Sequence, residues 1–126
     1  MKAGVVLVSL CGLTACAFDV SFVKTIPATF VAKPDCGEPF TLTRGESVGV
    51  GSGFPTKLQP NAKWRCSGTT EMGDVYATAD QIVTVTASNM YEAMPVVSDT
   101  KLVGFYLPVD RRVAPVEPGV PLQIQR

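Results

Sequence analysis

The stretch YEAMPVVSDTKLVGFYLPV, residues 91–109, decides the fold class. It contains two apolar-rich runs, residues 91–97 and 102–109, separated by Ser98-Asp99-Thr100-Lys101. Two such runs joined by a short polar segment are typical of a β-hairpin, and four polar residues suit a type I turn. Pro108 ends the second strand, because proline has no N–H to donate to an interior ladder. The stretch therefore predicts two antiparallel strands.

Both faces of the second predicted strand are apolar, since residues 102–107 include almost no polar side chain. This pattern suits a strand that its own domain covers on both sides. It also suits a strand whose second face binds another protein. On that second interpretation, the candidate partner-binding residues are Leu102, Phe105 and Tyr106.

The rest of the chain after the N-terminal region also favours strands. Residues 40–43 alternate between apolar and polar, and residues 82–86 are all β-branched. Ten prolines and eleven glycines interrupt the sequence so often that no helix longer than a turn or two is expected. Residues 89–94 are the one place where we allow a helical turn. We predict an all-β domain over residues 40–112, a small barrel or sandwich of short antiparallel strands.

Both ends of this domain are rich in proline. Residues 16–39 are predicted to be a lipid anchor and tether, since proline recurs through the second half of that stretch. Residues 113–126 are predicted to be a proline-rich tail, with Pro115, Pro118 and Pro121 at the three-residue period of a polyproline II helix. The tail is either a frayed end or a strip that docks onto another envelope protein.

The N-terminus has the pattern of an export signal. Residues 3–13 form an apolar run behind Met1-Lys2, and this run is too short for the roughly 20 residues of a membrane-spanning helix. It ends in Leu13-Thr14-Ala15-Cys16, which resembles the lipobox of bacterial lipoproteins. The resemblance implies a signal peptide over residues 1–15 and a lipid on Cys16. Because Ala17 follows the cysteine, it also implies sorting to the outer membrane. The alternative is an ordinary secretory signal with Cys16 as a free thiol.

Two cysteines, Cys36 and Cys66, remain in the mature chain once Cys11 has left with the signal and Cys16 carries lipid. An even pair in an oxidising compartment predicts a disulfide. Two buried free thiols, or a bridge to another chain, are the alternatives. Trp64, two residues before Cys66, is predicted to be a core ring beside this bridge.

Composition argues against catalysis and against nucleic-acid binding. The chain has no histidine, which excludes Ser–His and Cys–His nucleophile pairs and imidazole metal ligands. Two thiols are too few for a Cys-only zinc site, and the acidic residues lack calcium-loop spacing. The 11 basic and 11 acidic residues balance without a basic patch. We predict no metal, cofactor, small-molecule substrate or nucleic-acid partner. The sequence leaves one catalytic alternative open, a pair of carboxylates of the glycosidase type, because two such residues need to be close in space and not in sequence.

Three non-catalytic functions remain. The first is a structural or binding module of an envelope assembly, similar to the small lipoprotein subunit of type IV secretion systems in its lipobox, its size and its proline-rich segment. The second is a tethered inhibitor: DCGEPFTL, residues 35–42, resembles an early strand of periplasmic C-type lysozyme inhibitors, but their Ser-Gly-x-x-Tyr loop does not occur, because Phe54 follows Ser52-Gly53. The third is a surface or superinfection exclusion lipoprotein.

Overall fold

The computed structural model describes residues 23–50, 54–87 and 89–126, and these residues contain strands but no helix. The predicted all-β fold with short antiparallel strands is confirmed. The strands are β1 (Ile26–Pro27), β2 (Val31–Ala32), β3 (Phe40–Leu42), β4 (Glu46–Val48), β5 (Thr56–Leu58), β6 (Lys63–Thr69), β7 (Asp74–Ala77), β8 (Thr84–Thr86), β9 (Met90–Glu92), β10 (Met94–Ser98), β11 (Lys101–Leu107), β12 (Arg112–Pro121) and β13 (Ile124–Gln125).

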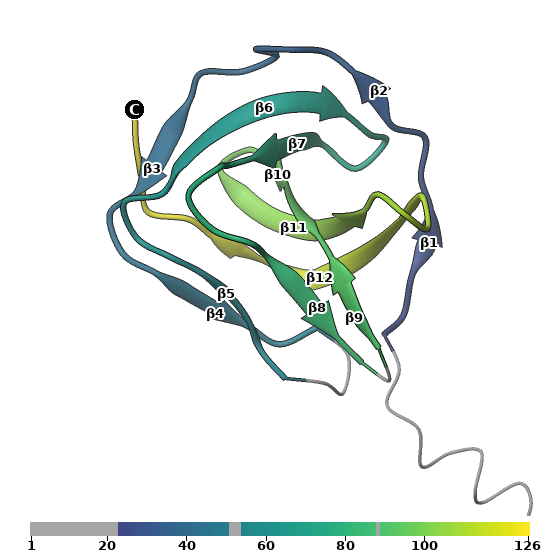
Figure 1. The fold of residues 1–126 in the computed structure, drawn as a ribbon. Helices are drawn as coiled ribbons and strands as arrows, with labels where there is room; N and C mark the ends of the chain where they lie inside the picture. The colour runs from purple at the N-terminus through teal and green to yellow at the C-terminus, as the bar shows by residue number, and fades with distance from the viewer. Residues whose placement is uncertain (1–22, 51–53, 88) are drawn as a thin grey trace, which may run out of the picture.

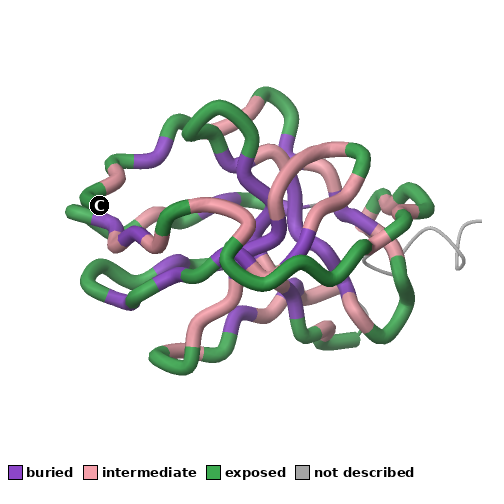
Figure 2. The backbone as a smooth tube through the Cα atoms, turned by 90° about the horizontal axis from the view of Figure 1, so that it is seen from above, coloured by how far each residue is buried: buried purple, intermediate pink, exposed green. Residues whose placement is uncertain are grey.

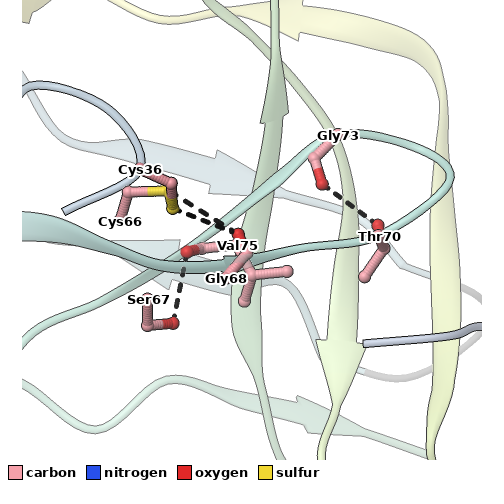
Figure 3. The surroundings of a disulfide bond; sticks show 7 residues. All are labelled: Cys36, Cys66, Ser67, Gly68, Thr70, Gly73 and Val75. Atoms are coloured by element: carbon pink, nitrogen blue, oxygen red, sulfur yellow. Dashed lines mark hydrogen bonds between the residues drawn. A yellow bond between two sulfur atoms is a disulfide. The ribbon is translucent and has the colours of Figure 1, made fainter. Parts of the chain in front are cut away.

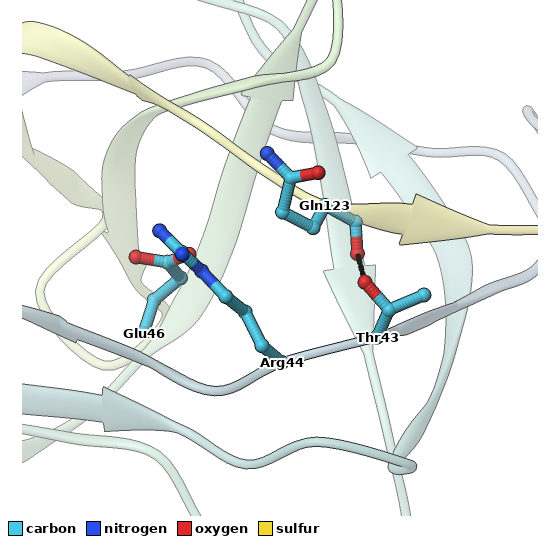
Figure 4. A network of polar contacts seen from close by, with 4 residues as sticks. All are labelled: Thr43, Arg44, Glu46 and Gln123. Atoms are coloured by element: carbon cyan, nitrogen blue, oxygen red, sulfur yellow. Dashed lines mark hydrogen bonds and ion pairs between the residues drawn. The ribbon is translucent and has the colours of Figure 1, made fainter.

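Six strands follow one another around one antiparallel sheet, in the order β3, β6, β7, β10, β11 and β12 (Figure 1). The sheet closes because the chain continues from β12 into β13, which pairs with β3 through Ile124 opposite Leu42. Just outside this pairing, the Thr43 N–H and hydroxyl both donate to the Gln123 carbonyl, at 2.8 and 3.3 Å (Figure 4). The fold is therefore a small closed barrel.

An ion pair lies beside this closure. Arg44 Nε is 3.3 Å from Glu46 Oε2 (Figure 4). The Arg44 side chain is 71% exposed, so water screens the attraction and the pair contributes little to stability. Backbone pairing of β13 with β3, not charge, holds the barrel shut.

Two hairpins, β4–β5 and β8–β9, are inserted between neighbouring barrel strands and pack against each other. The Thr56 hydroxyl donates to the Thr84 carbonyl at 3.0 Å. Gln81 accepts from the Gln59 N–H at 2.7 Å and donates to the Lys57 carbonyl at 3.2 Å. The helical turn predicted over residues 89–94 is wrong, because residues 90–92 pair with β8.

The side chains inside the barrel form the main core, which appears as the buried centre of the chain in Figure 2. Successive residues of a strand point to opposite faces, so Tyr76 belongs to this inner core while its neighbour Val75 belongs to a second cluster on the outer face. The largest fully buried side chains of the inner core are Trp64, Phe105, Leu42 and Leu102. The barrel is therefore filled by its own side chains.

The predicted hairpin is confirmed as β10–β11, but its turn is shorter than predicted. Ser98 pairs with Lys101, so only Asp99 and Thr100 form the loop, with φ of 54° and 58°. Positive φ at both central residues defines a type I′ turn, whose twist matches that of the flanking strands, whereas a type I turn would splay them. β11 ends at Leu107, directly before Pro108, as predicted.

The segment before β3 is not a free tether. Residues 24–35, which we call the N-terminal strap, run along one side of the barrel from β1 to β2 (Figure 1). β1 pairs with β12 and β2 pairs with β6, while Phe30 stacks on Tyr106 with ring centroids 5.1 Å apart. The tether predicted over residues 16–39 is therefore wrong for the strap, whose side chains bury apolar surface. Residues 16–22 lie outside the described residues.

The disulfide between Cys36 and Cys66 is confirmed, and it ties the end of the strap to β6 (Figure 3). Both sulfur atoms lie near the Gly68 carbonyl oxygen, at 3.5 and 3.6 Å. Disulfide sulfurs carry no hydrogen to donate, so these are contacts and not hydrogen bonds. The predicted core position of Trp64 is confirmed, since its side chain is 2% exposed.

The proline-rich tail predicted over residues 113–126 is wrong, because this segment forms β12 and β13. β12 pairs with β11 along most of its length. Prolines fit in β12 for two reasons. First, part of β12 is a bulge, where the backbone does not pair with β11. Second, the edge of β12 that faces away from β11 pairs only at Arg112 and Val113, with the two-residue β1, so no ladder on that side needs a proline N–H.

Candidate binding groove

A groove opens beside the bulge of β12. It encloses about 560 Å³ between the first residues of the strap, β11 and β12. Its walls are mostly apolar, and two side chains of opposite charge, Lys24 and Glu117, also line it. The apolar lining residues are Ile26, Met72, Val103, Pro115, Val116 and Pro118.

The bulge that forms the groove follows from a mismatch between the two strands. Gly104 pairs with Pro115, but Leu102 pairs with Val120, so residues 116–119 stand opposite Val103 alone. These four residues loop away from the ladder, and Glu117 and Pro118 are exposed. The backbone of residues 116–119 is therefore outside the β11–β12 pairing and faces the groove.

The structure brings together only part of the predicted partner-binding set. Pro115 and Pro118 line the groove. Pro121 is opposite Lys101 at the far end of β12 and is not among the lining residues.

The three residues predicted on β11 are not available to a partner. Leu102 and Phe105 point into the barrel and are 0% exposed. Tyr106 is on the outer face but is 5% exposed beneath Phe30 of the strap. The first interpretation of this two-faced apolar strand is correct, since the domain covers both faces itself.

Sequence reasoning missed Ile26, Met72 and Val103 as groove residues. Val103 carried a usable signal, because it alternates with Leu102 and therefore points to the opposite face of β11. Ile26 and Met72 carried none, since one comes from the strap and the other from the β6–β7 turn. Only the fold brings them beside β12.

Two other hollows are less suitable for binding. Trp64, Tyr76 and Met94 line a cavity of about 180 Å³, which is below the usual range of about 300–1,000 Å³ for ligand pockets. The Trp64 Nε1–H is buried and has no hydrogen-bond partner among the described residues. A wider hollow of about 640 Å³ lies beside Glu38 and Arg126, whose ion pair at 3.4 Å is largely exposed to water.

Few ionisable groups have a perturbed pKa. Burial raises the pKa of the Tyr76 phenol, and the Asp74 carboxylate raises it further, against an opposing effect of Arg126. The Thr29 backbone N–H donates to Glu71 Oε1 at 2.8 Å and lowers the pKa of that carboxyl. Neither group lines the groove. These shifts reflect packing of the barrel and the strap.

Within the described ranges, no three His, Cys, Asp or Glu side chains are grouped so that they could hold a metal ion. No helix in the described part of the chain is long and apolar enough to cross a membrane.

Comparison with known proteins identifies no relative. A scan against protein-family models, a search of curated proteins and a search of solved structures each found no match.

Proposed function

We propose that this protein is an outer-membrane-anchored lipoprotein that acts as a non-catalytic structural or binding module of an envelope assembly, such as a secretion or conjugation system. The lipobox resemblance at Leu13-Thr14-Ala15-Cys16 supports the anchor. The groove beside residues 116–119 is the observation that carries the binding role. The absence of histidine removes Ser–His and Cys–His nucleophile pairs, which supports a non-catalytic role.

The proposed occupant of the groove is an extended, mainly apolar segment of another envelope protein. Residues 116–119 lie outside the register of the β11–β12 ladder, so an added strand would pair with the backbone there, except at the nitrogen of Pro118, which carries no hydrogen. Val103 and Met72 supply apolar contact for alternate side chains of that strand. Lys24 and Glu117 would fix its direction by pairing with charges of opposite sign.

Site-specific photo-crosslinking tests this role in intact cells. A photoreactive amino acid at Val103 should capture one defined envelope protein, and the crosslinked peptide should map to an extended apolar segment. The matched control is Val109, which is 87% exposed on the neighbouring β11–β12 turn but does not line the groove. The same adducts at both positions would contradict the proposal.

Two substitutions test the binding site and the anchor separately. Val103→Asp should remove the captured partner from co-purification, whereas Val109→Asp should retain it, because only the first puts a charge into the groove. Cys16→Ala should abolish fatty-acid labelling and release the protein from membranes. Persistent labelling of the Cys16→Ala protein would show that the lipobox interpretation is wrong.

A further inference from the structure

The described chain begins beside the groove. Lys24 and Ile26, two residues apart in the strap, both line it, and Val23 is the first described residue. Val23 packs against the inner core instead and does not line the groove. Neighbouring residues of an extended chain point to opposite sides, so this stretch presents its even-numbered side chains to the groove.

The sequence before Val23 continues the same alternation. Residues 18–22, which lie outside the described residues, read Phe-Asp-Val-Ser-Phe, so apolar residues occupy the even positions and polar residues the odd ones. A period of two is the pattern of a strand with one apolar face. Because Lys24 lines the groove, continuing the alternation places the three apolar side chains on that same side.

β12 has an open edge along the path that this segment would take. β1 pairs with that edge in antiparallel register, with Ile26 opposite Val113. Each step back along the chain from Ile26 corresponds to one step forward along β12, so Phe22, four residues earlier, would be opposite Glu117, four residues later. Residues 116–119 are outside the register of the β11–β12 ladder. Their backbone is therefore the part of β12 that a strand continuing β1 would reach.

We infer that residues 18–22 extend β1 along this open edge and occupy the groove until a partner displaces them. Phe22 and Val20 would cover Met72 and Val103, two groove side chains that the described residues leave partly exposed. The groove is then a binding site that the chain itself keeps closed. As control of partner binding this rests on the proposed function, whereas the contact within the chain does not.

A segment attached beside its site needs little affinity of its own. Phe22 is joined directly to Val23, so no linker separates it from the groove. Even a short flexible linker holds a tethered segment at an effective concentration on the order of millimolar. An outside segment must bind tightly enough to overcome this competitor, so a closed groove favours one well-fitting apolar partner over many weak ones.

The first test looks for the contact within the chain. The full-length protein is purified in detergent without any partner, with a photoreactive phenylalanine analogue at position 22. Ultraviolet light should join this position to Met72 or Val103, as mapped by mass spectrometry of the crosslinked peptides. The matched control has the same analogue at Ser21, which the alternation turns away from the groove, and should give these adducts at least fivefold less often. A non-reducing gel confirms that both variants keep the Cys36–Cys66 bridge.

Two outcomes of this first test would overturn the inference. Equal yields of groove adducts from positions 21 and 22 would show that the segment has no fixed face toward the groove. Adducts that join two copies of the chain, seen at doubled mass on a denaturing gel, would show that a second copy is the occupant.

The second test asks whether the segment competes with a partner in intact cells. The photoreactive amino acid is placed at Val103, and the yield of captured envelope protein is compared between variants. Phe22→Asp should raise this yield at least threefold, because a charge at position 22 weakens the competitor in the apolar groove. Ser21→Asp is the matched control and should leave the yield unchanged. An unchanged yield in Phe22→Asp would overturn the claim that the segment closes the groove.

The two tests together separate this inference from the proposed function. Capture of a partner at Val103, with no groove adducts from position 22, would overturn the inference and leave the proposed function intact. Groove adducts from position 22, with no partner captured at Val103 in any variant, would overturn the proposed function and leave residues 18–22 as a fixed cover of the groove.

Discussion

Replacing Phe30 with alanine should loosen the N-terminal strap from the barrel. The Phe30 ring is half-buried and stacks on Tyr106 with an interplanar angle of 18°. A fully buried Phe→Ala change costs about 3–5 kcal/mol, and an aromatic pair contributes about 0.5–1.5 kcal/mol beyond its buried area. For a half-buried ring we expect the free energy of unfolding to fall by about 2 kcal/mol.

Urea unfolding followed by the fluorescence of Trp64, the single tryptophan, measures this loss. Phe54→Ala is the matched control, because it removes the same ring from an exposed position and should change stability by less than about 0.5 kcal/mol. If Phe30→Ala also stays within about 0.5 kcal/mol of the unmodified chain, the strap is not held by this stack.

Gly68→Ala tests the same contact from the other side. A Cβ at position 68 would lie 2.5 Å from two carbons of the Phe30 ring and 2.6 Å from the Val31 carbonyl oxygen. The strap would have to move, so this variant should also be destabilised. The double variant with Phe30→Ala should lose less free energy of unfolding than the sum of the losses in the two single variants. Without the Phe30 ring, the new Cβ clashes only with the Val31 carbonyl oxygen. Strict additivity would contradict the proposed packing.

Three further predictions concern the disulfide, the pH dependence and the core. Replacing Cys36 and Cys66 together with alanine should lower the free energy of unfolding by about 3.6 kcal/mol in the chain-entropy model, because the bridge closes a loop with a sequence separation of 30; calorimetry measures this. Since folding lowers the pKa of Glu71, its carboxylate stabilises the fold above the ordinary value of 4.5, and this contribution is lost as pH falls through the folded pKa. Urea unfolding at a series of pH values should therefore show a smaller loss below pH 4.5 in Glu71→Gln than in the unmodified chain. Phe105→Ala, inside the barrel, should cost about 3–5 kcal/mol by urea unfolding, and a loss below about 1 kcal/mol would show that the ring is not fully buried.

Local pattern was enough to predict some of the strands that form the barrel, namely β3, β10 and β11. The alternation of residues 40–43, and the two apolar runs on either side of Ser98, each predicted a strand that the structure contains. The disulfide was also predicted, because the lipobox resemblance implies that Cys11 leaves with the signal and that Cys16 carries lipid, which leaves the pair Cys36 and Cys66. These features depend on side-chain periodicity or simple counting, both of which are present in the sequence itself.

The errors came from segments whose structure depends on a distant partner. Residues 113–126 have the prolines of an extended free chain, yet β11 supplies a ladder and the bulge accommodates the prolines that cannot donate. The strap likewise looks irregular, because β1 and β2 are two residues each and exist only through pairing with β12 and β6. No periodic pattern of apolar and polar residues within these segments indicates such pairing. The groove was missed for the same reason.

The pairing of β13 with β3 has a consequence for the order of folding. Every other neighbour in the six-stranded barrel follows its partner along the chain either directly or after one inserted hairpin, whereas contacts such as those of Thr41 and Thr43 with the β13 region join residues 80–84 positions apart. Local pairs form fastest, so the barrel should close last at this seam. Until then β3 presents an open edge, and such edges recruit strands from other molecules. The pairing of β13 with β3 of its own chain or of a second chain would thus decide between a closed monomer and a strand-exchanged dimer.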